Sequence, residues 1–133
     1  MIEEDLLAQD RTSGAAAAEW GKRTGKALAQ KLGATDLSPN SNACRLDGLR
    51  VAIKCAAPAT DSVGVTYKML EHLDAVIGAF QREDGAFDLW SLAPSVFKEH
   101  VRDSKSKRSR GKTGLVRRDV FESRGKAVGQ LRL

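Results

Sequence analysis

At 133 residues the chain has the length of one domain, and 41% hydrophobic residues with only seven aromatic ones predict a mainly aliphatic core. No apolar run approaches the roughly 18 residues of a membrane span, and the acidic start MIEEDLLAQD differs from the basic start of a signal peptide. The spacing of two Cys and two His residues fits no common structural zinc motif. We therefore expect a cytoplasmic protein without a membrane segment.

Positive charge is concentrated at the C-terminus. Residues 1–101 hold 11 Lys and Arg against 14 Asp and Glu, whereas residues 102–133 hold 11 against 3, a net charge of +8. A basic terminal segment on a near-neutral domain is typical of polyanion binding, and a solubilising tail is the alternative. We expect two regions: a core at 1–101 and a basic C-terminal segment at 102–133.

The first predicted element is an amphipathic helix at 14–32. Thr12 or Ser13 can cap its start, apolar residues recur at three- and four-residue steps, and Gly33 suits the position just after a helix end. Pro39 and its polar neighbours then break regular structure.

A β-hairpin follows, with Asp47-Gly48 as its turn. This dipeptide suits a two-residue turn in which both positions need positive φ. The cysteines then lie about 13 Å apart along the strands, too far for a disulfide. The predicted cross-strand pairs are Leu46 with Leu49, Arg45 with Arg50, Cys44 with Val51, Ala43 with Ala52, and Ser41 with Lys54.

The second strand of the hairpin presents two different faces. Val51, Ile53 and Cys55 form the predicted core face. The opposite face combines small and basic residues, which would let a phosphate backbone approach closely; an ordinary solvated face is the alternative. Its members are Arg50, Ala52, Lys54 and Ala56.

The remaining elements alternate between helix and strand. After a loop around 58–64 we expect a short helix at 65–73, a buried strand at 74–81, a turn, and a strand at 86–92. Pro94 suits the first turn of the next helix. A second short helix within 115–123 would dock Val116, Val120 and Phe121 on the core. The fold class is therefore mixed α/β, in the order α-β-β-α-β-β-α.

Two stretches, SPNSNACRLDGLRVAIKCA and VTYKMLEHLDAVIGAF, resemble the core of the PD-(D/E)XK nuclease superfamily. The resemblance implies a restriction-endonuclease-like fold with a mixed sheet of about four strands flanked by helices. It also implies an Mg²⁺-dependent endonuclease in which carboxylates hold the ion that orients the attacking water. Within that pattern Lys54 matches the catalytic lysine, Asp47 is the available metal ligand, and Glu19 matches a glutamate of the N-terminal helix.

The motif departs from the family at its acidic positions. Ala52 stands two residues before Lys54, where the family has a metal-binding Glu or Asp, and the predicted hairpin puts Arg45 or Ala43 at the Asp position. Glu19 can equally form a surface ion pair with Lys22 or Arg23. Loss of the metal site, an engineered Ala52 and an unusual assembly of the site all remain open. We predict no metal-dependent cleavage, with Mg²⁺ as a cofactor only of an active enzyme.

Double-stranded DNA is the expected partner. On the hairpin, Arg45, Arg50 and Lys54 are the predicted phosphate contacts. The polar stretch SKSKRSRGKTG has the composition of a loosely ordered segment. Its cations and one just before it are the predicted sequence-independent backbone contacts: Arg102, Lys105, Lys107, Arg108, Arg110 and Lys112.

Two other functions fit the same charges. The chain could be a non-catalytic interaction or assembly subunit whose basic segment binds an acidic partner. RNA binding is the third hypothesis, but aromatic residues for base stacking are scarce. Dimerisation is common for the resembled fold, so a homodimer is also an expectation.

Overall fold

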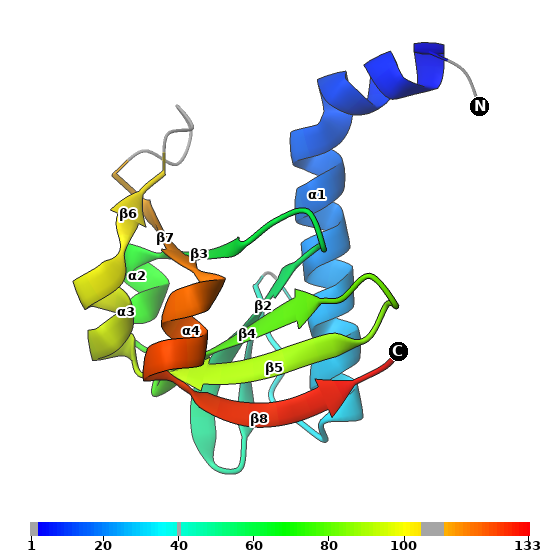
Figure 1. Cartoon of the computed structure of the whole chain (residues 1–133). Helices are drawn as coiled ribbons and strands as arrows, with labels where there is room; N and C mark the ends of the chain where they lie inside the picture. The colour runs from blue at the N-terminus through cyan, green and yellow to red at the C-terminus, as the bar shows by residue number, and fades with distance from the viewer. Residues whose placement is uncertain (1–2, 40, 105–110) are drawn as a thin grey trace.

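A computed structural model describes residues 3–39, 41–104 and 111–133, with side chains from residue 16 onward. Its centre is a five-stranded mixed sheet in the order β1-β2-β4-β5-β8, beside a three-stranded antiparallel sheet in the order β3-β7-β6 (Figure 1). The larger sheet comprises β1 (Ala43–Leu46), β2 (Leu49–Ala56), β4 (Ala75–Gln81), β5 (Phe87–Leu92) and β8 (Lys126–Leu131). The smaller comprises β3 (Ser62–Thr66), β6 (Arg102–Asp103) and β7 (Thr113–Arg117).

Helices cover both faces of the larger sheet. The long helix α1 (Glu3–Lys31) lies along one face, and its N-terminal part extends beyond the sheets (Figure 1). Three short helices and the smaller sheet cover the other face: α2 (Tyr67–Leu70), α3 (Pro94–His100) and α4 (Arg118–Arg124). The predicted mixed α/β class is confirmed, with five strands in the sheet where about four were expected.

Helix α1 includes the predicted helix but begins about ten residues earlier than predicted. Residues 3–11 are rich in Glu, Leu, Ala, Gln and Arg, which favour helix, so Thr12 and Ser13 do not start it. At its other end, Leu28 and Ala29 pack against Val51 and Ile53 of β2. The apolar spacing thus identified the buried stripe but not the helix start.

The hairpin forms as predicted. Asp47 and Gly48 have φ of 53° and 80°, the positive values that the turn requires. The four pairs from Ala43–Ala52 to Leu46–Leu49 are those expected, and both cysteines are free. The expected Ser41–Lys54 pair is wrong, because β1 starts at Ala43 and the last hydrogen bond on that side is from the Ile53 N–H to the Asn42 carbonyl oxygen at 3.1 Å.

Both faces of β2 are buried from Val51 to Ile53, and Ala56 is buried too, which corrects the prediction of a small, basic outer face. Ala52 and Ala56 are 0% and 2% exposed and pack with Val63, Val65 and Phe80. The reason is topological: β2 runs parallel to the central strand β4, and interior strands of such sheets are covered on both sides. No phosphate backbone can approach across Ala52.

The segment after β2 contains a strand where a loop was predicted. Val63 and Val65 alternate with small residues in β3, and both are buried. The following helix α2 is therefore shorter than expected. The predicted strands at 74–81 and 86–92 correspond to β4 and β5, and Pro94 opens α3.

The basic C-terminal segment contributes strands to both sheets. β7 pairs with β3, and β8 pairs with β5. The predicted short helix is α4, whose Phe121 is fully buried and contacts Phe80 and Phe97 with ring centroids 5.4 Å and 6.5 Å away. Among the helices that the structure describes, none combines the length and apolarity needed to span a membrane.

Candidate nucleic-acid interface

A recessed pocket lies where α1 crosses the C-terminal half of β2. It encloses about 220 Å³, and we call it the Lys54 pocket. Two cationic side chains and one amide provide its polar groups. Its lining residues are Ala18, Gly21, Lys22, Asn42, Lys54 and Cys55.

Two local features bring these residues together. β1 pairs with β2 only as far as Ala52, so the edge of β2 at Lys54 stays open toward α1. Gly25 lets α1 approach, because a side chain there would meet the Asn42 amide and lie 3.1 Å from the Ile53 carbonyl oxygen. Asn42 in turn donates a hydrogen bond to the Gly21 carbonyl oxygen at 3.3 Å.

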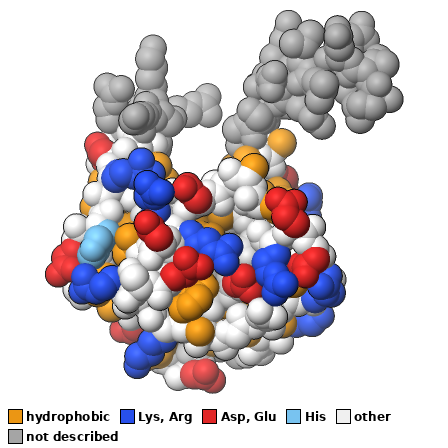
Figure 2. Space-filling view, viewed as in Figure 1, with side chains coloured by type: hydrophobic (Ala, Val, Ile, Leu, Met, Phe, Trp, Pro, Cys, Tyr) orange, Lys and Arg blue, Asp and Glu red, His pale blue; other side chains and the backbone are white. Residues whose placement is uncertain are grey.

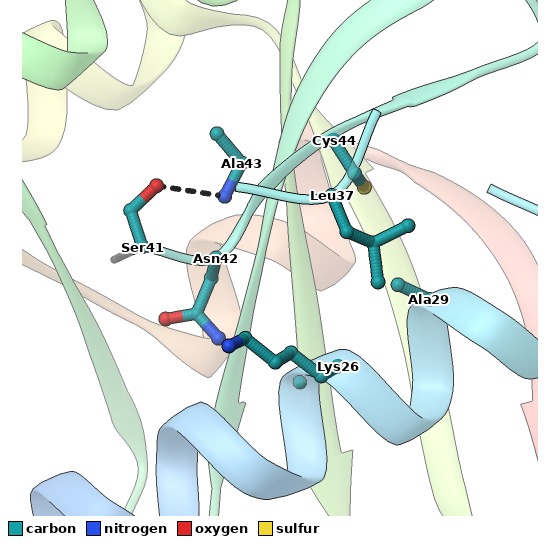
Figure 3. Close-up of a pocket in the computed structure, with 8 residues that line it drawn as sticks. Lys26, Ala29, Leu37, Ser41, Asn42, Ala43 and Cys44 are labelled. Atoms are coloured by element: carbon teal, nitrogen blue, oxygen red, sulfur yellow. Dashed lines mark hydrogen bonds between the residues drawn. The ribbon is translucent and has the colours of Figure 1, made fainter. Parts of the chain in front are cut away.

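The loop before β1 holds Asn42 against α1 (Figure 3). The amide of Asn42 points toward the helix, while Leu37 lies over Ala29. Lys26 Nζ donates to the Pro39 carbonyl oxygen at 3.1 Å. The cavity beneath this contact is about 10 Å³, enough for one water at most. The contact between this loop and α1 is therefore a packing contact with no room for a ligand.

The Lys54 pocket is electropositive and lacks a carboxylate. Burial is the main cause that lowers the pKa of Lys54; the Cys55 thiol acts in the opposite direction, and Lys22 adds to the lowering. Burial raises the pKa of Cys55 to about 12, so this thiol is no nucleophile at neutral pH. Within the described ranges neither Lys22 nor Lys54 forms an ion pair.

The predicted catalytic residues are not brought together. Asp47 lies in the hairpin turn, about 17 Å along the strand from Lys54 at 3.3 Å per residue. Glu19 is exposed on α1 and does not line the pocket, and Ala52 is buried in the core. No three Asp, Glu, His or Cys side chains of the described segments converge on one point. These residues do not fit an Mg²⁺ site beside Lys54.

Arg45 and Arg50 form a separate site at the other end of the hairpin. They lie directly opposite each other and line a cavity of about 270 Å³ with Asp36 and Ser38. Arg45 pairs with Asp36 at 3.5 Å. Arg50 is about 13 Å along β2 from Lys54, so the three predicted hairpin contacts do not form one continuous surface.

Of the six predicted backbone contacts between residues 102 and 112, the structure describes only the first and the last. Arg102 is exposed and donates to the Ser62 hydroxyl at 3.4 Å, and Lys112 is exposed near α2. The other four predicted contacts lie outside the described residues: Lys105, Lys107, Arg108 and Arg110.

Several arginines of the same segment are engaged in ion pairs. Arg118 reaches Asp88 and Glu122, both at 3.0 Å, and Arg124 reaches Glu99 at 3.6 Å. In Figure 2 basic and acidic side chains are interspersed over the face in view. The segment's net charge therefore overstates the number of cations available to a ligand.

Lys22 and Asn42 were not predicted from the sequence to be part of the site. Their signal is Gly25 inside α1, where an added side chain would meet the Asn42 amide. Glycine is unfavourable inside a helix by about 1 kcal/mol relative to alanine, so its presence there suggests a close packing contact. The contact of Asn42 with Gly25 and the position of Lys22 beside Lys54 could be identified only from the tertiary structure.

The sequence matches no protein-family model, and no curated protein is significantly similar to it.

Proposed function

We propose that the protein binds duplex DNA and that Lys54 and Lys22 hold a backbone phosphate in the Lys54 pocket. The observation that carries this proposal is the convergence of two cations and an amide donor in a recess without a lining carboxylate. Phosphate oxygens would accept hydrogen bonds from both ammonium groups and from the amide.

The energetics favour an anionic ligand. Two neighbouring ammonium groups repel each other, and the recess removes part of the hydration of Lys54. A bound phosphate would offset both costs, because its charge attracts the cations more strongly away from bulk water. Four other exposed cations are the proposed secondary contacts along a polyanion: Arg23, Arg50, Lys68 and Lys112.

The proposed fold family is the restriction-endonuclease-like one. Three features support it: α1 packs on the hairpin, β2 runs parallel to β4, and Lys54 lies at the open edge of β2. Because Ala52 is buried and Asp47 is distant, the proposed activity is binding, with no step that uses Mg²⁺.

Fluorescence anisotropy with a blunt duplex of about 20 base pairs tests the proposal across about 50–200 mM salt. One phosphate contact contributes about −0.9 to the log–log salt slope, so Lys54→Met should flatten the slope by about that amount and lower affinity about fivefold. Lys54→Arg should retain both. The matched control is Lys98→Met, at an exposed lysine on α3, with no expected effect.

The same titration examines the competing functions. Equal binding by wild type and Lys54→Met would contradict the proposal. Preference for an RNA duplex or an acidic peptide over DNA would favour the RNA or assembly function instead. Replacing Lys105, Lys107, Arg108 and Arg110 with Ser should flatten the slope further if these predicted contacts reach DNA.

A further inference from the structure

A larger cavity lies between α2 and the start of β7. It encloses about 530 Å³, within the roughly 300–1,000 Å³ usual for small-molecule sites. We call it the Tyr67 cavity. Its lining residues are Thr66, Tyr67, Lys68, Glu71, Gly111 and Lys112.

Tyr67 is the only tyrosine of the chain, and two hydrogen bonds and close packing on Gly114 hold it in place. Its hydroxyl donates to Asp103 at 2.7 Å, and its backbone N–H donates to the Lys112 carbonyl oxygen at 2.9 Å. Gly114 leaves room for the ring, since a side chain there would lie 2.9 Å from Tyr67 Cε1 and would also meet Val101. The ring is therefore held in a fixed orientation while it lines the cavity.

Asp103 also fixes the opposite wall. Its second oxygen accepts a hydrogen bond from the Gly111 backbone N–H at 3.2 Å. The hydrogen bond with Asp103 is the main cause that raises the pKa of Tyr67, so the phenol stays protonated at neutral pH. One carboxylate thus links an aromatic ring to the backbone beside Lys112.

The chemical groups in this cavity are complementary to those of a nucleotide. An aromatic ring offers a stacking surface for a base of any sequence. Lys68 and Lys112 can bind phosphate, and neither forms an ion pair within the described part of the chain. Glu71 offers acceptors for the amino or imino groups of a base edge.

We propose that the Tyr67 cavity binds an unpaired nucleotide of the bound nucleic acid, with the base on Tyr67 and its phosphates near Lys68 and Lys112. This inference rests on the proposed DNA binding but uses a separate site. Lys54 and Lys22 do not line this cavity, and Tyr67 does not line the Lys54 pocket.

The test compares a blunt duplex with the same duplex carrying a single-stranded end of about three nucleotides. Wild type should bind the tailed duplex about tenfold more tightly, because stacking of one base commonly contributes about five- to 150-fold in affinity. Tyr67→Leu should abolish this preference and leave the affinity for the blunt duplex unchanged. Tyr67→Phe keeps the ring without the hydroxyl and should retain most of the preference for the tailed duplex.

A 2-aminopurine in the tail provides a local readout. Its fluorescence should be quenched on binding to wild type and to Tyr67→Phe, but not to Tyr67→Leu. Equal affinity of wild type for blunt and tailed duplexes would overturn the inference, as would an equal loss on both duplexes in Tyr67→Leu. If Tyr67→Leu does not fold, the double variant Lys68→Ala/Lys112→Ala should lose the preference instead.

Failure of the two proposals can be told apart. If blunt duplex does not bind and Lys54→Met changes nothing, the proposed function fails. A single-stranded hexanucleotide then still tests the Tyr67 cavity, and its binding should weaken about tenfold in Tyr67→Leu. No binding of that hexanucleotide would overturn the inference by itself.

Discussion

The arginines around α4 and the lysines of the Lys54 pocket carry the same charge in opposite surroundings. Arg118 has two carboxylates at 3.0 Å, and its guanidinium lies 5.3 Å from the centre of the Phe80 ring. Lys22 and Lys54 meet an amide and a thiol but no lining carboxylate. The first group stabilises the fold, whereas the second remains available for an external anion.

This difference shows that net charge alone does not tell which cations have a carboxylate beside them. Segment 102–133 carries a net charge of +8, yet four of its five described arginines form ion pairs: those at 117, 118, 124 and 132. The fifth, Arg102, donates to the Ser62 hydroxyl. Residues 1–101 are net negative but contain the exposed Lys22 and the half-buried Lys54, which line the Lys54 pocket. The absence of a neighbouring carboxylate is therefore more informative than the number of positive charges in a segment.

The largest expected effect comes from placing a carboxylate at Ala52, two residues before Lys54 and on the face of the sheet away from α1. Ala52→Glu would bury a charge among apolar side chains, and we expect a loss of about 3–5 kcal/mol in the free energy of unfolding, measured in urea. Ala59→Glu, in an exposed loop, should change it by less than about 0.5 kcal/mol. A stably folded Ala52→Glu variant that nicks plasmid with Mg²⁺ would contradict the burial argument and restore the enzyme hypothesis.

A smaller effect should follow from removing the structural cation. The Arg118 and Asp88 side chains are only 32% and 19% exposed, so Arg118→Met leaves a part-buried carboxylate with Arg82 at 3.8 Å as its remaining ion-pair partner. We expect the free energy of unfolding to fall by about 1–2 kcal/mol, measured by thermal or chemical denaturation. The salt slope of DNA binding should not change. A flattened slope with unchanged stability would reverse the roles assigned to the two groups of cations.

Unlike Arg118→Met, Lys54→Met should stabilise the free protein, by about 0.5–1 kcal/mol at neutral pH, because it removes a recessed charge. Burial lowers the folded-state pKa of Lys54 below the unfolded value of about 10.4, so the unfolded chain binds more protons between these two values. Wild-type stability should therefore rise relative to Lys54→Met as pH increases through that window. Urea unfolding from pH 7 to 10.5 measures the difference in the free energy of unfolding between Lys54→Met and wild type. An advantage of Lys54→Met that grows with pH would contradict the prediction.

The smallest effect is expected at an exposed pair. Arg124 and Glu99 lie 3.6 Å apart with side chains 48% and 61% exposed, and such pairs commonly contribute only about 0.2–1 kcal/mol. Arg124→Ala should lower the melting temperature by about 2 °C or less and leave DNA binding unchanged. A loss comparable to that of Arg118→Met would mean that exposure does not separate these arginines.

Much of the fold was accessible from the sequence because its signals are local. The hairpin register follows from Asp47-Gly48, which needs positive φ at both positions. The buried strand β4 follows from its continuous apolar run, and the start of α3 follows from Pro94. The β3 strand was missed, although the alternation of Val63 and Val65 was a usable signal.

The candidate site was only partly accessible in the same way. Lys54 was identified from the sequence, but the face around it was predicted to let a phosphate backbone approach because Ala52 and Ala56 are small, and both are buried. An alanine carries no sign of what packs on it, so its burial depends on elements contributed from elsewhere. Lys22 was missed because its position relative to Lys54 depends on how closely α1 approaches β2.

The sequence by itself determined the turns, the apolar stripe of α1 and the order of most elements, since each depends on residues a few positions apart. The tertiary structure decided which strands pair beyond the hairpin: β8 with β5, and β7 with β3. It also decided which cations meet carboxylates, because Arg118 and Asp88 are 30 residues apart. Ion pairing and burial depend on distances in space, and contacts between distant segments set those distances.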